Sequence, residues 1–170
     1  RHDKAWKSSE LMIRQLTEIV SKGGNLLLNV SPNGEGALLT ETKERLDDIG
    51  KWMKVNQEAV YGTHPWIVNS ESISFEKTAE AQDKAGKNTM QDTDNDNTSK
   101  EIHPDICYTA KNNVVYLFAR SWKSEDLIAN SFAGSKFTVK KVNLLGSSKS
   151  IKWMQDEQGL RINMPDKLPE

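Results

Sequence analysis

Apolar residues recur at a helical spacing between residues 8 and 22 of the chain. Ser8 or Ser9 can cap such a helix at its start, because a serine hydroxyl accepts a hydrogen bond from a free N–H of the first turn. Gly23 and Gly24 can end it, since glycine readily adopts the left-handed conformation that closes a last turn. The pattern predicts an amphipathic helix with an apolar face at i, i+4, i+7 and i+8: Met12, Leu16, Ile19 and Val20.

The run Leu26, Leu27 and Leu28 comes next and does not alternate with polar residues. A non-alternating apolar run is typical of a strand buried on both faces, as parallel strands covered by helices are. The first 66 residues hold no second parallel strand that could pair with residues 25–30. We therefore expect residues 25–30 to form a buried strand of a barrel or sheet whose other strands lie outside this chain.

A second helix is predicted after the turn-rich residues 31–36. It begins near Thr40 and runs to about Asn56, with apolar residues on one face. Residues 1–63 thus read helix, strand, helix. The apolar face of the second helix carries Leu46, Ile49 and Met53.

Beyond His64 the helical spacing gives way to short segments of alternating polar and apolar residues. Alternating segments separated by turn residues are typical of antiparallel strands. We therefore predict an antiparallel β-sandwich over residues 64–170, which makes the whole chain an α+β protein. The predicted strands are 67–75, 106–122, 136–145, 150–154 and 160–164, with turns at 111–113, 146–148 and 157–159.

Residues 76–101 contain almost no bulky apolar side chain, so a flexible polar loop of the sandwich is predicted there. The acidic stretch 92–99 imitates the start of a calcium-binding loop. It has Asn97 where such a loop needs glycine and His103 where it needs glutamate. A solvated run of charges is the favoured interpretation, and loose calcium binding is the alternative.

Composition excludes several classes of partner. The 170 residues carry a formal net charge of -1, with acidic and basic residues interspersed. Such a chain has no sustained field that would gather nucleic acid or an anionic membrane surface. No apolar run approaches the roughly 20 residues needed to cross a bilayer. A neutral ligand such as a sugar fits this charge balance.

The residue types needed for metal or thiol chemistry are scarce. The single cysteine, Cys107, lies in an apolar alternating stretch and is interpreted as a buried structural thiol. The three histidines, His2, His64 and His103, are far apart in the sequence and have no ligand at metal-binding spacing. We predict no metal site and no cofactor.

Three stretches, in this order, resemble the α-L-fucosidases of glycoside hydrolase family 29: Val20–Pro32, Glu44–Met53 and Asn56–Trp66. The resemblance is strong over residues 7–66 and weaker over residues 102–168. Ser31 stands where the family usually has glycine, and His64 stands where it usually has arginine.

The resemblance implies a (β/α)8-like catalytic barrel followed by a β-sandwich. Residues 25–30 would be the last barrel strand, flanked by the penultimate helix and the closing helix. Loops after barrel strands form the active-site face, so Asn29 and Ser31 become the candidate substrate-binding residues. The competing interpretation is that these residues simply begin a turn.

The family is also one of retaining glycosidases, which use two carboxyl groups about 5 Å apart across the glycosidic bond. The resemblance places both upstream of the position that matches Arg1, so no catalytic residue is predicted in this chain. The longer protein is then expected to release α-linked L-fucose from glycans. Its partners would be a fucosylated glycan and the remaining barrel segments. If the longer protein is exported, its signal sequence would lie before Arg1; the compartment is left open, with periplasmic, secreted and lysosomal as the options.

A noncatalytic role is the alternative. The sandwich would brace the barrel or bind carbohydrate, and Trp122, after a predicted strand, is the candidate aromatic surface for a glycan. Bracing is favoured because the pattern shows no clear aromatic platform. Exposed leucines in residues 25–30 would favour pairing with missing segments or self-association.

Overall fold

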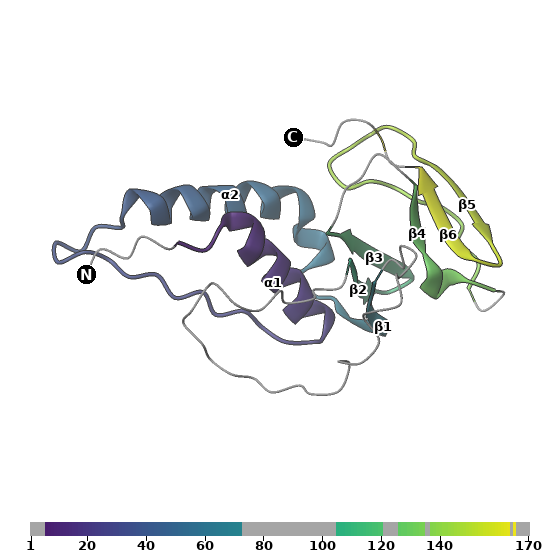
Figure 1. Ribbon diagram of the computed structural model, residues 1–170, viewed down its shortest axis with the longest axis horizontal. Coiled ribbons are helices and arrows are strands. Elements are labelled where there is room, and N and C mark those ends of the chain that lie inside the picture. The colour runs from purple at the N-terminus through teal and green to yellow at the C-terminus, as the bar shows by residue number, and fades with distance from the viewer. Residues whose placement is uncertain (1–5, 73–104, 121–125, 135–136, 164, 166–170) are drawn as a thin grey trace, which may run out of the picture.

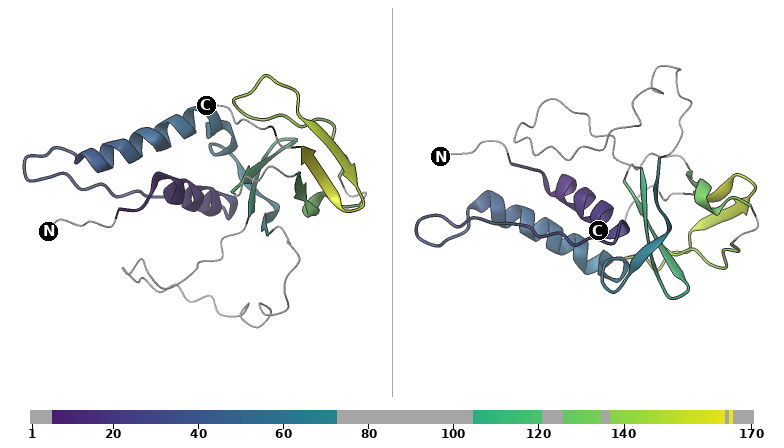
Figure 2. Two further views of the ribbon diagram at one scale, coloured as in Figure 1. Left: turned by 45° about the horizontal axis from the view of Figure 1, so that its top comes forward. Right: turned by 90° about the horizontal axis from the view of Figure 1, so that it is seen from below.

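The structure is a computed structural model, and it describes residues 6–72, 105–120, 126–134, 137–163 and 165. Two helices lie at one end of the molecule and two small sheets at the other, and α1 and α2 lie side by side with their C-terminal ends toward the first sheet (Figures 1 and 2). The predicted loop at 76–101, its acidic stretch and Trp122 lie outside the described residues.

Helix α1 spans Ser9–Ser21, and both of its ends follow the local signals in the sequence. Ser8 Oγ accepts a hydrogen bond from the N–H of Leu11 at 3.1 Å. At the other end Gly23, with φ 81°, donates to the carbonyl of Val20, and Gly24 donates to that of Ile19 at 2.9 Å. This pair of bonds is a Schellman motif. The predicted helix is confirmed.

Helix α2 spans Thr40–Asn56 and continues into a 3-10 turn, η1, at Gln57–Ala59. The predicted bounds of this helix are confirmed. Ser9 at the start of α1 donates to Asp48 Oδ2 of α2 at 2.9 Å, which ties the two helices together.

The strand predicted at residues 25–30 is not formed, and the expectation of burial on both faces is wrong for this structure. Leu27 is 93% exposed, and Leu28 and Val30 are also exposed. The nearest strand-like pairing among the described residues is a single bridge between Pro32 and Leu38. A strand is held by hydrogen bonds to a neighbour. None of the described residues supplies one here, so the barrel end is not seen as a sheet.

Antiparallel strands are present beyond residue 63, as predicted, and the described residues form two three-stranded sheets. The first contains β1 (His64–Glu71), β2 (Ile106–Lys111) and β3 (Val114–Ala119), in the order β1-β2-β3. The second contains β4 (Leu127–Ala129), β5 (Lys152–Asp156) and β6 (Gly159–Asn163), in the order β4-β6-β5, with a 3-10 turn, η2, at Asn130–Phe132. All ladders are antiparallel.

The two sheets share one apolar core. Trp66 of β1 stacks on Phe132 of η2, with ring centroids 4.7 Å apart, and lies against Tyr108 of β2. The buried side chains of the shared core are Ile106, Tyr108, Leu127, Ala129, Phe132, Leu160 and Ile162.

The strand predicted at 136–145 is wrong, since residues 137–145 have no regular secondary structure. The side chain of Gln155 takes the hydrogen bonds that a strand partner would take. Its Oε1 accepts from the N–H of Val139 at 3.0 Å, and its Nε2 donates to the carbonyl of Phe137 at 2.6 Å. The three-residue strand β4 was not predicted.

Candidate functional site

The loop after residues 25–30 is a closed turn organised by Asn33. Asn33 Oδ1 accepts from the N–H groups of Glu35 and Ala37 at 3.0 and 2.9 Å. The main chain of Asn33 donates to the carbonyl of Ala37 at 2.8 Å and accepts from Gly36 at 3.0 Å. Gly36 has φ 80°, which suits glycine. The turn residues at 31–36 therefore form a turn, as their composition indicates.

Asn29 and Ser31, the predicted substrate-binding residues, lie at the entry to this turn and are exposed. Within the described part of the chain, no hydrogen bond involves either side chain. Their donors and acceptors therefore face solvent. The described residues also contain no group of three or more histidine, cysteine, aspartate or glutamate side chains that could hold a metal ion. Neither described helix is long and apolar enough to cross a membrane.

A buried arginine connects the first sheet to α1. The side chain of Arg120, just after β3, is 5% exposed, and its Nη1 lies 3.3 Å from Glu18 Oε2. Its Nη2 donates to the carbonyl of Arg14, and Arg14 Nη2 donates to the carbonyl of Arg120 at 3.3 Å. No sequence pattern indicates this junction, because its partners lie about a hundred residues apart.

Near this arginine, α1 contacts β2 at two fully buried residues, Ser21 and Cys107. Burial raises the pKa of the Cys107 thiol, and the nearby Arg120 and Ser21 only partly offset that rise. A thiol with a raised pKa forms little thiolate and is a poor nucleophile. The interpretation of Cys107 as a buried residue is confirmed.

A second polar cluster joins the two sheets. Tyr108 donates its phenol O–H to Glu71 Oε1 at 2.7 Å. Ser131 donates its main-chain N–H to Glu71 Oε2 at 2.9 Å and also donates its hydroxyl to that oxygen. Burial and the Glu71 carboxylate both raise the pKa of Tyr108 far above its usual value. The cluster holds β1, β2 and η2 in one arrangement.

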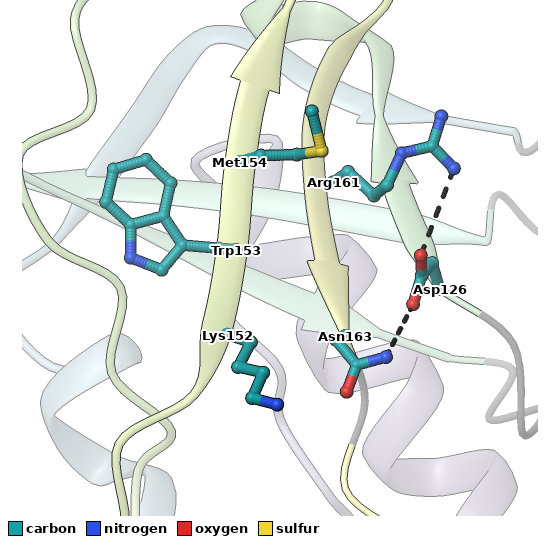
Figure 3. Close-up of a pocket in the computed structure, with 6 residues that line it drawn as sticks. All are labelled: Asp126, Lys152, Trp153, Met154, Arg161 and Asn163. Atoms are coloured by element: carbon teal, nitrogen blue, oxygen red, sulfur yellow. Dashed lines mark hydrogen bonds and ion pairs between the residues drawn. The ribbon is translucent and has the colours of Figure 1, made fainter.

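The outer face of the second sheet carries a shallow depression of about 170 Å³. Asn163 donates to Asp126 Oδ1 at 2.9 Å, and Arg161 lies 3.9 Å from Asp126 Oδ2. Figure 3 shows Met154 and Lys152 on one side of β5 and the indole of Trp153 on the other. Trp153 packs on the core, so the exposed apolar surface here is Met154. Polar groups around one methionine can contact a ligand but provide no aromatic platform.

Comparison with known proteins matches the chain in two parts. The α-L-fucosidase family model matches residues 1–58, and the α-L-fucosidase C-terminal domain model matches residues 95–170. The tissue α-L-fucosidase of Rattus norvegicus is 30% identical over 159 residues, which cover 93% of this chain and 28% of the relative. The plasma α-L-fucosidase of Homo sapiens is 28% identical over 159 residues, which cover 92% of this chain and 28% of the relative.

The fold is similar to that of solved bacterial fucosidases. The α-fucosidase of Thermotoga maritima superposes with a TM-score of 0.70 at 23% identity, covering 98% of this chain and 32% of that chain. The α-L-fucosidase isoenzyme 1 of Paenibacillus thiaminolyticus gives a TM-score of 0.69 at 23% identity, covering 99% of this chain and 34% of that chain. At this identity the likeness concerns the fold alone.

The two helices and the paired antiparallel sheets thus share the fold of part of the solved fucosidases, and residues 95–170 match a fucosidase C-terminal domain. The two family matches, in their order along the chain, are more specific. The chain belongs to the α-L-fucosidase family of glycoside hydrolases and corresponds to its C-terminal part. It spans about 28% of the length of the curated relatives that it matches.

Proposed function

We propose that this chain is the C-terminal part of an α-L-fucosidase that releases α-linked L-fucose from glycans with net retention. The observation that carries the proposal is the pair of family matches over residues 1–58 and 95–170. A retaining glycosidase needs a nucleophilic carboxylate and an acid/base carboxyl group. We assign both to the part of the longer protein that precedes this chain, so the chain alone is expected to be inactive.

We further propose that residues 25–30 form the last strand of a (β/α)8-like barrel when the rest of that protein is present. The exposure of Leu27 and Leu28 supports this, because large apolar side chains are normally buried in a completed fold. The domain boundary would then fall between residues 63 and 64. Asn29 and Ser31 would lie at the rim of the active-site face, where barrel loops contact substrate.

The test compares the 170-residue chain with the longer protein on an aryl α-L-fucoside. We expect turnover by the longer protein alone, with the α anomer of fucose as the first product seen by NMR. Replacing Asn29 by alanine in the longer protein should raise KM several-fold. Turnover by the isolated chain would overturn the assignment of the carboxylates, and an unchanged KM would overturn the role of Asn29.

A second function, bracing of the barrel by the sandwich, is favoured by the contacts of Arg120 with α1. Its competitor is carbohydrate binding at the depression around Met154. Calorimetric titration of the 170-residue chain with L-fucose and a fucosylated oligosaccharide separates the two. Bracing predicts no heat of binding. Heat that disappears in Met154→Ala but persists in the surface variant Val114→Ala would favour carbohydrate binding.

A further inference from the structure

We infer that Arg120 is a positioning residue of the fucosidase site: it fixes α1 and, through α1, the segment 25–31 that carries Asn29 and Ser31. The inference rests on the proposed function, in which that segment lies at the edge of the active site. It extends that function by assigning to one buried side chain of the sandwich a measurable effect on substrate binding.

The contacts of Arg120 restrict both sliding and rotation of α1. Its guanidinium bonds to the carbonyl of Arg14 and to the carboxylate of Glu18, two groups one helical turn apart. Because the planar guanidinium contacts two successive turns, it fixes the orientation of α1, which a single point charge would not do. The side chain is 5% exposed, so salt screens this ion pair much less than a surface pair.

Other contacts extend the same junction to the end of α1. Ser21 is fully buried, next to Cys107 of β2. A Cβ atom added to Gly23 would lie 3.1 Å from Pro65 Cγ of β1, so the end of the helix is in close contact with the first sheet. The contact surface therefore runs from Arg14 to Gly23.

The segment 25–31 leaves directly from this fixed end. Its main chain makes no strand pairing to the described residues, so α1 sets the point from which it starts. In a completed barrel, neighbouring strands would set its sideways position, and α1 would still set where along the strand axis the segment begins. A shift of about 1 Å at such a rim is enough to change catalytic efficiency strongly.

The experiment uses the longer protein with three single variants: Arg120→Gln, Glu18→Gln and the control Lys51→Gln. Lys51 is a suitable control because it also pairs with a carboxylate, Asp48, but both residues lie within α2 and the lysine side chain is exposed. Steady-state kinetics on an aryl α-L-fucoside are measured well below the Tm of each variant. If Arg120→Gln does not fold, Arg120→Lys, which keeps the charge but not the fork, takes its place.

We expect Arg120→Gln and Glu18→Gln to lower kcat/KM about tenfold, mainly through a higher KM, because the rim is displaced while the catalytic carboxylates are not. The double variant should lose less than the product of the two single losses, since both break the same ion pair. Lys51→Gln should change KM less than about twofold. An unchanged KM in a folded Arg120 variant, or a loss of kcat alone, overturns the inference.

Hydrogen exchange separates this inference from the proposed function. In the Arg120 variant, amides of residues 19–31 should exchange at least about tenfold faster, while those of β5 and β6 keep their rates. If the longer protein has no fucosidase activity but this local change appears, the proposed function fails and the control of segment 25–31 by Arg120 stands. If the activity is present and exchange in 19–31 is unchanged, the inference fails alone.

Discussion

Replacing Tyr108 by phenylalanine tests the polar cluster between the two sheets. The change removes the hydroxyl that donates to Glu71 at 2.7 Å and leaves the buried ring in place. Glu71 keeps two bonds from Ser131, so the carboxylate stays partly satisfied. A hydrogen bond to a charged group contributes about 1.5–3 kcal/mol. We expect a loss of about 2 kcal/mol in the free energy of unfolding and a fall in Tm of roughly 4–8 °C.

The pH dependence gives this prediction a second, independent readout. The folded-state pKa of Tyr108 is raised, so the unfolded chain loses the phenol proton first as the pH rises above about 10. The wild type therefore keeps the full contribution of this group below pH 10 and loses about 1.4 kcal/mol per pH unit above it. Tyr108→Phe lacks this loss, so the difference between the two proteins should shrink above pH 10.

Urea unfolding of the 170-residue chain, followed by far-UV circular dichroism at pH 7, 9 and 10.5, measures both effects. The matched control is Tyr116→Phe, since Tyr116 donates to Glu58 at 3.2 Å on the surface and should matter by less than about 0.5 kcal/mol. Equal losses for the two variants, or a loss for Tyr108→Phe that stays constant above pH 10, would refute the reasoning.

Three further predictions use the same unfolding assay or a thiol assay. Gly159→Ala should lower the free energy of unfolding by about 3 kcal/mol, because φ is 140° and the new Cβ would lie 2.4 Å from the carbonyl oxygen of Ala129. The control Gly36→Ala has open space around the new Cβ and should lower it by about 1 kcal/mol. Equal losses for the two variants would contradict the clash at Gly159. Gly50→Ala in α2 should add about 0.5–1 kcal/mol, since nothing lies within 4 Å of the new methyl group, and destabilisation would contradict that open space. Cys107 should react with a thiol reagent only as fast as the protein unfolds, and rapid labelling of the folded chain would contradict its burial.

Helix α1 could be predicted because its ends are set locally. Ser8 caps α1, and Gly23 and Gly24 supply the conformations and hydrogen bonds that end it. Residues 25–30 could not be placed in the same way. Their apolar run indicates burial, but burial depends on partner strands, and none of the described residues provides one. The apolar pattern indicates that a segment can form a buried strand, whereas the strand forms only where neighbouring strands are present to pair with it.

The sheets show the same limit on a smaller scale. Residues 137–145 alternate as a strand would, yet their main chain bonds to the side chain of Gln155 and not to a neighbouring strand. The pattern of apolar and polar residues cannot predict a side-chain contact of this kind. The candidate site divides in the same way. Asn29 and Ser31 could be selected only through the family resemblance and the position it implies. Arg120 could not be selected at all, since its contacts with α1 join residues about a hundred positions apart.

Strand β1 and helix α1 together argue that the two halves of this chain form one unit. The family models match residues 1–58 and 95–170, so β1 lies in neither match. Yet β1 pairs with β2, and its Pro65 closes over Gly23 at the end of α1. Arg120 then returns from β3 to the same helix. These contacts join segments on the two sides of the proposed boundary after residue 63. We therefore expect the helices and the first sheet to unfold in one cooperative step.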